Sequence, residues 1–221
     1  MDLLCDTSYR RHNDLVGALL AGGRSRRLGQ PKPLLDFAGL PLGLHLLSRL
    51  EEFCDRAVIL ANEPELYSSW NRPVIPDIHP GLGPLAGLHA ALRANPDEWV
   101  FLLACDLPFF PAKLGALTRA RATDCQAVIP RRGPYLEPLC AAYSPAALPV
   151  VETRIRTESG PDLKVTSILR DLDVRYLDEA DRAHLGPDEV LFLNINTPAD
   201  LVLARRLWSA PLEAGTQIDY S

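Results

Sequence analysis

The chain has 221 residues, of which 47% are hydrophobic and 23% are charged, an ordinary balance for one globular domain with a sizeable core. Its formal net charge of -5 argues against a general nucleic-acid binder, because such proteins are usually basic. No apolar run approaches the ~18 residues of a transmembrane span. The polar residues 1–14 also lack the apolar stretch of a signal peptide, so we expect a cytoplasmic protein without membrane contacts.

The chain divides into three parts. We expect a disordered N-terminal extension over residues 1–14, one domain over 15–210 and a tail over 211–221. The five cysteines are scattered and never spaced as C-x-x-C, which favours reduced, mostly buried thiols over disulfides or a zinc site. The five histidines show no metal-ligand spacing, and we assign them no catalytic role.

Short apolar runs alternate with helical patterns along the first part of the domain. The predicted strands are Val16–Leu20, Ala57–Ala61, Pro73–Pro76, Trp99–Ala104 and Ala127–Pro130. The predicted helices are Pro41–Phe53, Pro64–Trp70, Pro84–Ala94 and Pro111–Arg121. Each helix begins with proline, which the first helical turn tolerates. Several strands are apolar throughout, as in a sheet covered by helices on both faces. The pattern predicts a doubly wound, three-layer α/β/α fold with a mostly parallel, Rossmann-like sheet.

The second part of the chain is less regular. A turn at Arg131–Pro134 precedes a predicted antiparallel strand, which would be a small addition to the sheet. The further elements are a strand at Glu137–Tyr143, a helical stretch at Pro145–Leu169 broken near Ser159–Pro161, strands at Val174–Leu177 and Leu191–Ile195, and a helix at Pro198–Leu207. Ligands of such sheets bind at the carboxyl ends of the strands, so the residues that follow strands are the candidates for function.

A glycine pair and a basic run follow the first predicted strand. Gly22 and Gly23 let a base or a phosphate approach the backbone closely and offer N–H donors. Three arginines and Lys32 then concentrate positive charge within nine residues, which indicates polyanion binding. The loop matches neither the P-loop nor the G-x-G-x-x-G pattern. The alternative is a solvated basic loop whose glycines serve only the turn.

Three later motifs also follow predicted strands. Asp77 precedes a Gly-Pro-Leu-Ala-Gly run, whose small residues permit a helix N-terminus to pack against a nucleotide; an ordinary loop with a proline-started helix is the alternative. Asn62, after the second strand, is a weaker candidate for the same surface. Asp106 ends a buried strand, and Mg²⁺ prefers one or two carboxylates plus phosphate oxygens. The alternative role for Asp106 is to cap the next helix. In Asn-Ile-Asn-Thr-Pro, Thr197 is the expected N-cap of the last helix.

The run Leu20-Ala-Gly-Gly-x-Ser-x-Arg-Leu-Gly-x-Pro-Lys32 closely resembles the signature loop of the molybdenum cofactor nucleotidyltransferases. The Gly-Pro-Leu-Ala-Gly run, Asp106 and the Asn-x-Asn-Thr-Pro run follow in the order typical of that family, so the resemblance extends from Gly17 to Trp208. The double glycine, the Gly-Pro-Leu-Ala-Gly run and the last motif favour the guanylyltransferase branch over the cytidylyltransferase branch. The chain departs from many members at Pro31, where they have aspartate.

The resemblance implies a nucleotidyltransferase fold and transfer of GMP from GTP to molybdenum-bound molybdopterin, with Mg²⁺ as cofactor and Mn²⁺ as a substitute. Molybdoenzymes or cofactor-insertion proteins are the implied transient partners. The implied catalytic residues are Lys32, Arg27 and Asp106, with Asp106 as the metal ligand. The implied nucleotide-binding residues are Leu20, Ala21, Gly22, Gly23, Lys32, Asn62, Asp77, Gly87 and Asp106. The implied acceptor-binding residues are Lys164, Asn194 and Asn196.

Several alternatives stay open. Arg131 or Arg132, beside Glu137, could meet the acceptor phosphate, but simple solvent exposure is the preferred interpretation for them and for Lys164. A cytidylyltransferase for the same pterin would share every phosphate-handling residue. A sugar-phosphate nucleotidylyltransferase would share the fold and the first loop. A non-catalytic GTP-binding or cofactor-escort module would not need a metal carboxylate.

Overall fold

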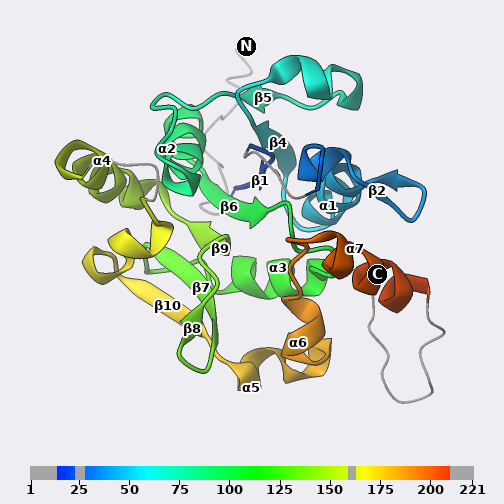
Figure 1. Cartoon of the computed structure of the whole chain (residues 1–221). Coiled ribbons are helices and arrows are strands. Elements are labelled where there is room, and N and C mark those ends of the chain that lie inside the picture. The colour runs from blue at the N-terminus through cyan, green and yellow to red at the C-terminus, as the bar shows by residue number, and fades with distance from the viewer. Residues whose placement is uncertain (1–13, 23–27, 159–162, 210–221) are drawn as a thin grey trace, which may run out of the picture.

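A mixed sheet of eight strands forms the centre of the protein (Figure 1). The computed structural model describes residues 14–22, 28–158 and 163–209. The strand order is β10 (Val174–Leu177), β7 (Ala127–Arg132), β9 (Cys140–Tyr143), β6 (Trp99–Ala104), β1 (Leu15–Leu20), β4 (Arg56–Leu60) and β5 (Val74–Ile75), while β8 (Tyr135–Leu136) pairs with the end of β7. Only β8 and β9 run antiparallel to their neighbours among these strands; all other pairs are parallel.

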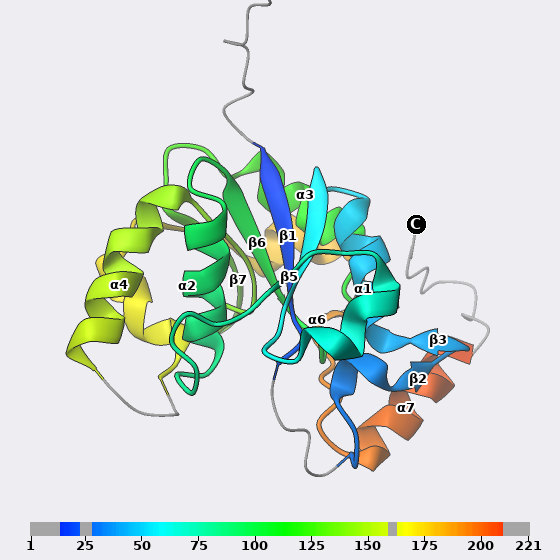
Figure 2. The same cartoon turned by 90° about the horizontal axis from the view of Figure 1, so that it is seen from above.

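Helices cover both faces of the sheet, which gives three layers when the molecule is seen from above (Figure 2). One face carries α2 (Pro84–Ala94) and α4 (Leu148–Thr157). The other face carries α1 (Leu42–Glu51), α3 (Ala112–Ala120) and α7 (Pro198–Ser209). The short elements are the hairpin of β2 (Asp36–Phe37) and β3 (Leu40–Pro41), the helices α5 (Glu179–Arg182) and α6 (Asp188–Leu191), and 3-10 turns at Lys32–Leu34, Pro64–Trp70, Pro145–Ala147, Val165–Asp171 and Ala183–Leu185.

The period of two along each strand divides the core into two halves. On β1, Leu15 and Leu19 face the α1 side while Val16 and Ala18 face the α2 side, and all four are at most 1% exposed. Between them lies Gly17, where an added Cβ would stand 2.9 Å from Cβ of Leu50 on α1. Only glycine therefore lets α1 pack this closely, and the continuous apolar run is explained by burial on both faces.

The predicted α/β architecture is confirmed, and most predicted strands match observed ones within two residues. The segment Pro64–Trp70 is a 3-10 helix rather than an α-helix. Pro41 and Pro111 precede their helices as N-cap residues, whereas Pro64 and Pro84 do begin theirs. The predicted helical stretch Pro145–Leu169 consists of a 3-10 turn, α4 and a second 3-10 helix; its expected break near 159–161 lies outside the described residues.

The predicted strand Leu191–Ile195 is wrong. Leu191 ends α6, and the residues after it pair with no strand of the sheet. Leu191, Phe192 and Ile195 are at most 3% exposed because they pack into the core from an irregular segment. A short apolar run indicates burial, but it does not by itself distinguish a strand from a buried loop or helix end.

The antiparallel strand lies inside the sheet rather than beside it. The strand predicted over Glu137–Tyr143 begins only at Cys140, and β9 sits between β6 and β7. Arg131, which we placed in a turn, is instead in β7 and pairs with β8. The extension over 1–14, apart from Asp14, and the tail over 211–221 lie outside the described residues, so this division stays a prediction. None of the described helices is long and apolar enough to cross a membrane.

Candidate active site

A cavity of about 1000 Å³ lies at the carboxyl ends of β1, β4 and β6. The chain passes from β1 to β4 and β5 on one side, and then returns to add β6 on the other side of β1. The cavity therefore occupies the switch point in strand order, where open α/β sheets bind ligands. Eight of the residues predicted to form the site line it: Leu20, Gly22, Lys32, Asn62, Asp77, Gly87, Asp106 and Asn196.

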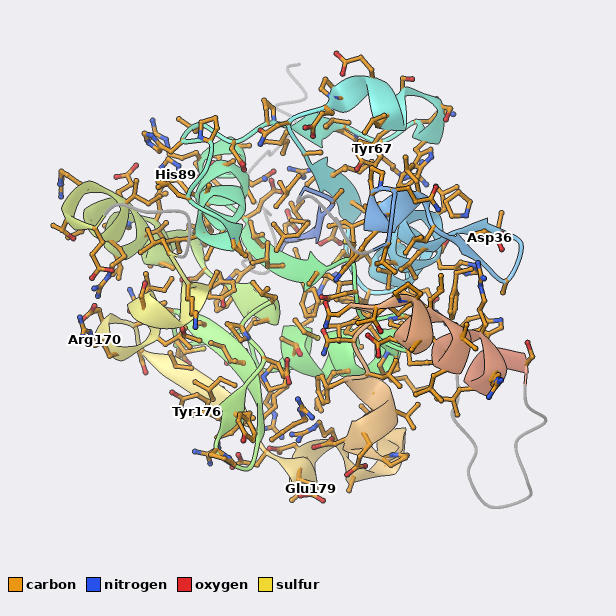
Figure 3. All side chains as sticks on the ribbon, viewed as in Figure 1. Asp36, Tyr67, His89, Arg170, Tyr176 and Glu179 are labelled. Atoms are coloured by element: carbon orange, nitrogen blue, oxygen red, sulfur yellow. The ribbon has the colours of Figure 1, made fainter. Side chains whose placement is uncertain are left out.

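The segment after β1 is fixed by backbone hydrogen bonds. The N–H groups of Ala21 and Gly22 both donate to the carbonyl of Leu60, at 3.0 and 3.1 Å. The hydroxyl of Tyr67, buried in the 3-10 helix before β5 (Figure 3), donates to the carbonyl of Ala21 at 3.1 Å. The expectation that the N–H of Gly22 serves as a ligand donor is therefore wrong, because the neighbouring strand uses it.

Two predicted residues of the first loop, Gly23 and Arg27, lie outside the described residues. Ala21 is described, but it is buried at 3% exposure and does not line the cavity. Its role in the structure is to join the end of β1 to Tyr67.

One wall of the cavity is formed by an amide and a carboxylate. Asn62 Nδ2 donates to Asp77 Oδ2 at 2.9 Å, and Asp77 N donates back to Asn62 Oδ1 at 2.9 Å. Each residue thus fixes the orientation of the other. On the same side, Gly87 of α2 faces the cavity, and an added Cβ there would stand 2.5 Å from Cδ2 of Leu20. A side chain at position 87 would therefore enter the cavity or displace Leu20.

The opposite part of the cavity holds a lysine between two oxygen acceptors. Lys32 begins the 3-10 turn Lys32–Leu34, and its Nζ donates to Asp106 Oδ2 at 3.2 Å and to Asn196 Oδ1 at 2.8 Å. The Lys32 and Asp106 side chains are 16% and 23% exposed, so the ion pair is largely but not fully withdrawn from water. The backbone N–H of Ile195 donates to the carbonyl of Asp106 at 2.9 Å, which joins the C-terminal motif to the end of β6.

The donor set around Asp106 fits a Mg²⁺ ion that also binds phosphate. No group of three or more histidine, cysteine, aspartate or glutamate side chains that could hold a metal occurs among the described residues. A single carboxylate facing a cavity suits Mg²⁺, which keeps water and phosphate oxygens as its other ligands. Beside Asp106, burial and then the Asp106 charge raise the pKa of the Cys105 thiol to about 12.

The other predicted acceptor residues are not brought to this cavity. Asn194 donates through its side chain to the carbonyl of Phe192 at 3.0 Å. Lys164 is exposed at the start of the 3-10 helix Val165–Asp171. Arg131 pairs with Asp178 at 2.7 Å, and Arg132 pairs with Glu137 at 2.7 Å.

Several residues that line the cavity were not predicted from the sequence. Leu60 and Ala61 follow from the end of β4 and were accessible to the same argument that found Asn62. Leu139 comes from the segment before β9 and lines the cavity without any recognisable motif. Tyr67 supports the first loop through one buried hydroxyl, which no local pattern indicates.

The sequence of this chain is similar to those of a known protein family. The family described as "MobA-like NTP transferase domain" matches residues 17–175. A relative from Pelotomaculum thermopropionicum, named "Probable molybdenum cofactor guanylyltransferase", is 34% identical over 190 residues, which are 86% of this chain and 91% of the relative. The molybdenum cofactor guanylyltransferase of Desulfosudis oleivorans is 32% identical over 205 residues, which are 91% of this chain and 97% of the relative.

A solved structure is similar to this chain in both fold and sequence. Molybdopterin-guanine dinucleotide biosynthesis protein A from Archaeoglobus fulgidus superposes with a TM-score of 0.75 at 30% identity, covering 88% of this chain and 98% of that one. The family match spans well over half of the chain, and the relatives align along nearly their full length. The chain therefore belongs to the MobA-like NTP transferase domain family.

Proposed function

We propose that this protein is a molybdenum cofactor guanylyltransferase, which transfers GMP from GTP to molybdenum-bound molybdopterin and releases pyrophosphate. The observation that carries the proposal is the convergence of Lys32, Asp106 and Asn196 on one cavity at the switch point of the sheet. The curated relatives that share most of the chain carry the name of this activity. The double glycine, the Gly-Pro-Leu-Ala-Gly run and the Asn-x-Asn-Thr-Pro run favour guanine as the base.

The nucleotide occupies the side of the cavity formed by β1, β4 and the start of α2. Leu20 packs directly on Gly87 in this wall, where an added Cβ would stand 2.5 Å from Cδ2 of Leu20, and both residues line the space that we assign to the base. The Asn62–Asp77 pair supplies polar groups beside this space in a fixed orientation. The sequence also proposes Gly23 for nucleotide binding and Arg27 for charge neutralisation, and both lie outside the described residues.

The reacting phosphates lie toward Lys32 and Asp106. Asp106 would hold Mg²⁺, with Mn²⁺ as a substitute, and the chemistry that the cation would supply is neutralisation of charge on the α-phosphate. Lys32 places its ammonium where negative charge collects on the departing pyrophosphate, and a charged donor in a site partly withdrawn from water is worth more than one in bulk solvent. Catalysis then consists of positioning and charge neutralisation.

The bond changes balance without an added acid or base. An oxygen of the acceptor's terminal phosphate, already an anion near neutral pH, forms a bond to the α-phosphorus of GTP. The bond between the α-phosphorus and its bridging oxygen breaks, and pyrophosphate leaves with the electron pair. We assign Asn196, which lines the cavity, to the binding of this acceptor. Asn194 and Lys164 remain proposed acceptor contacts that would require the acceptor to extend beyond the cavity.

The test is pyrophosphate release with molybdopterin cofactor and Mg²⁺, run separately with GTP, CTP, ATP and UTP. Release with GTP alone supports both the reaction and the base. Preference for CTP retains the mechanism and overturns the base assignment, which then becomes that of a cytidylyltransferase. No release with any nucleotide, with a verified acceptor, refutes the proposal. Sugar phosphates as acceptors would then be tested first, and nucleotide binding without turnover second.

A further inference from the structure

The turn that carries Asn196 is held by more hydrogen bonds than its helix requires. Thr197 is the N-cap of α7, and its Oγ1 accepts the backbone N–H of Asp200 at 3.2 Å. Asp200 Oδ2 accepts the N–H of Thr197 at 2.8 Å, which completes a reciprocal cap of the helix. The same oxygen also accepts the N–H of Asn196 at 2.9 Å. This last bond lies outside the helix and fixes the residue that contacts Lys32.

Asn196 contacts Asp200 through its backbone and Lys32 through its side chain. Its Oδ1 accepts a hydrogen bond from Lys32 Nζ at 2.8 Å, which is shorter than the 3.2 Å between Lys32 Nζ and Asp106 Oδ2. An ammonium group has three N–H donors. With two directed at these acceptors, the direction of the third is set by where Asn196 and Asp106 stand.

The Asp200 carboxylate is charged under ordinary conditions. Hydrogen bonds from the N–H of Asn196 and then from Thr197 hold the pKa of Asp200 below its usual value, and the positive charge of Lys32 acts in the same direction. A carboxylate bonded to two consecutive backbone N–H groups fixes a turn more firmly than a neutral acceptor would.

We propose that Asp200 is a positioning residue: it holds the Asn196 backbone so that Asn196 Oδ1 orients the Lys32 ammonium toward the triphosphate. The proposal rests on the proposed function, because the triphosphate is the ligand of Lys32 in that reaction. Asp200 itself touches neither substrate; its effect passes through Asn196 to Lys32.

The test is a double-mutant cycle of Asp200→Ala and Asn196→Ala. In the native protein Asp200→Ala should lower kcat/KM for GTP by about tenfold. In the Asn196→Ala variant it should lower kcat/KM by less than about twofold, because the hydrogen bond from Lys32 to the side chain of residue 196 is already absent. Asp200→Asn should restore part of the loss, since its amide oxygen can still accept from the turn. Equal effects of Asp200→Ala in both backgrounds would overturn the proposal.

Two further measurements separate positioning from helix capping and from the proposed reaction. Thr197→Ala removes the other half of the cap, so it should lower the melting temperature as Asp200→Ala does, yet leave kcat/KM within about twofold. If Asp200→Ala changes only the melting temperature, Asp200 is a cap and the proposal fails. The cycle is also measured as the Kd of a non-hydrolysable GTP analogue with Mg²⁺. If the enzyme shows no turnover but the effects of the two substitutions on Kd are non-additive, the proposed function is refuted and the role of Asp200 stands. If their effects on Kd are additive, the role of Asp200 is refuted.

Discussion

The substitution Asp106→Asn, at the end of β6, should leave the stability of the fold nearly unchanged while it lowers the rate of turnover. The Lys32–Asp106 pair is 16% and 23% exposed, and ion pairs near the surface contribute up to about 1 kcal/mol. Asparagine keeps the shape and one acceptor oxygen for Lys32, and the bond from Ile195 N–H to the carbonyl of residue 106 is unaffected. For a chain of this size a loss of about 1 kcal/mol lowers the melting temperature by roughly 2–4 °C. We expect the variant to fold.

Turnover should respond far more strongly than stability. Two carboxylates, Asp77 and Asp106, line the cavity among the described residues, and the proposed function assigns the metal to Asp106, which lies beside Lys32 at the end of β6. A metal contributes several kcal/mol to the transition state. A loss of about 3–5 kcal/mol, at 1.36 kcal/mol per factor of ten, lowers the rate roughly 10²- to 10⁴-fold.

The assay for Asp106→Asn is single-turnover pyrophosphate release at saturating GTP and Mg²⁺. Asp36→Asn is the matched control, because it makes the same chemical change on an exposed side chain of the β2–β3 hairpin (Figure 3). We expect the control to match the native rate. A rate for Asp106→Asn within tenfold of native would refute the assignment of the metal to this carboxylate.

Three other changes probe the cavity and its surroundings. Gly87→Ala should raise the KM for GTP about tenfold, because the new Cβ would stand 2.5 Å from Cδ2 of Leu20 and push that side chain into the base site. The melting temperature should change little, because alanine adds about 1 kcal/mol of helix propensity that offsets the cost of moving Leu20. An unchanged KM would contradict this prediction. Tyr67→Phe should lower the free energy of unfolding by about 1 kcal/mol in urea titrations, because the buried carbonyl of Ala21 loses its 3.1 Å donor; no change would mean that water replaces the hydroxyl. Burial lowers the pKa of His89 from 6.5, so the unfolded chain binds the proton more readily and stability should fall as the pH drops below 6.5. Urea unfolding at about pH 7.5 and 5.5 should show a smaller loss for His89→Gln, and an equal loss would assign the dependence to other groups.

The strands that form the floor of the site are predictable because each is a short, continuous apolar run, which is the pattern of a strand buried on both faces. Leu15 to Leu20 and Trp99 to Ala104 are apolar on both faces, and each lies beneath helices on both sides. The position of Asp106 follows from the second of these runs, since a polar residue directly after a buried parallel strand falls at the ligand-binding edge. These inferences need only local pattern and one rule of topology.

Contacts between distant segments were not predictable in the same way. Lys32 and Asn196 are 164 positions apart, and nothing local to either residue says that their side chains meet at 2.8 Å. The mostly apolar run Leu191–Ile195 favours a strand, but Leu191 ends α6 and the buried residues of the run pack into the core without pairing with the sheet. The use of the Gly22 N–H by Leu60 is likewise set by the neighbouring strand.

The charge of the site explains how an acidic protein can bind a triphosphate. Lys32 is the one basic side chain that lines the cavity in the described part of the chain, whereas two aspartates, Asp77 and Asp106, line it, so this lining is net negative. A polyanion would be repelled by that lining alone. The missing positive charge has two sources in the proposed reaction: a divalent cation on Asp106, and the arginines that the sequence places between Gly23 and Lys32. A cation on Asp106 would compete with Lys32 for that carboxylate, and Asn196 provides Lys32 with a second acceptor.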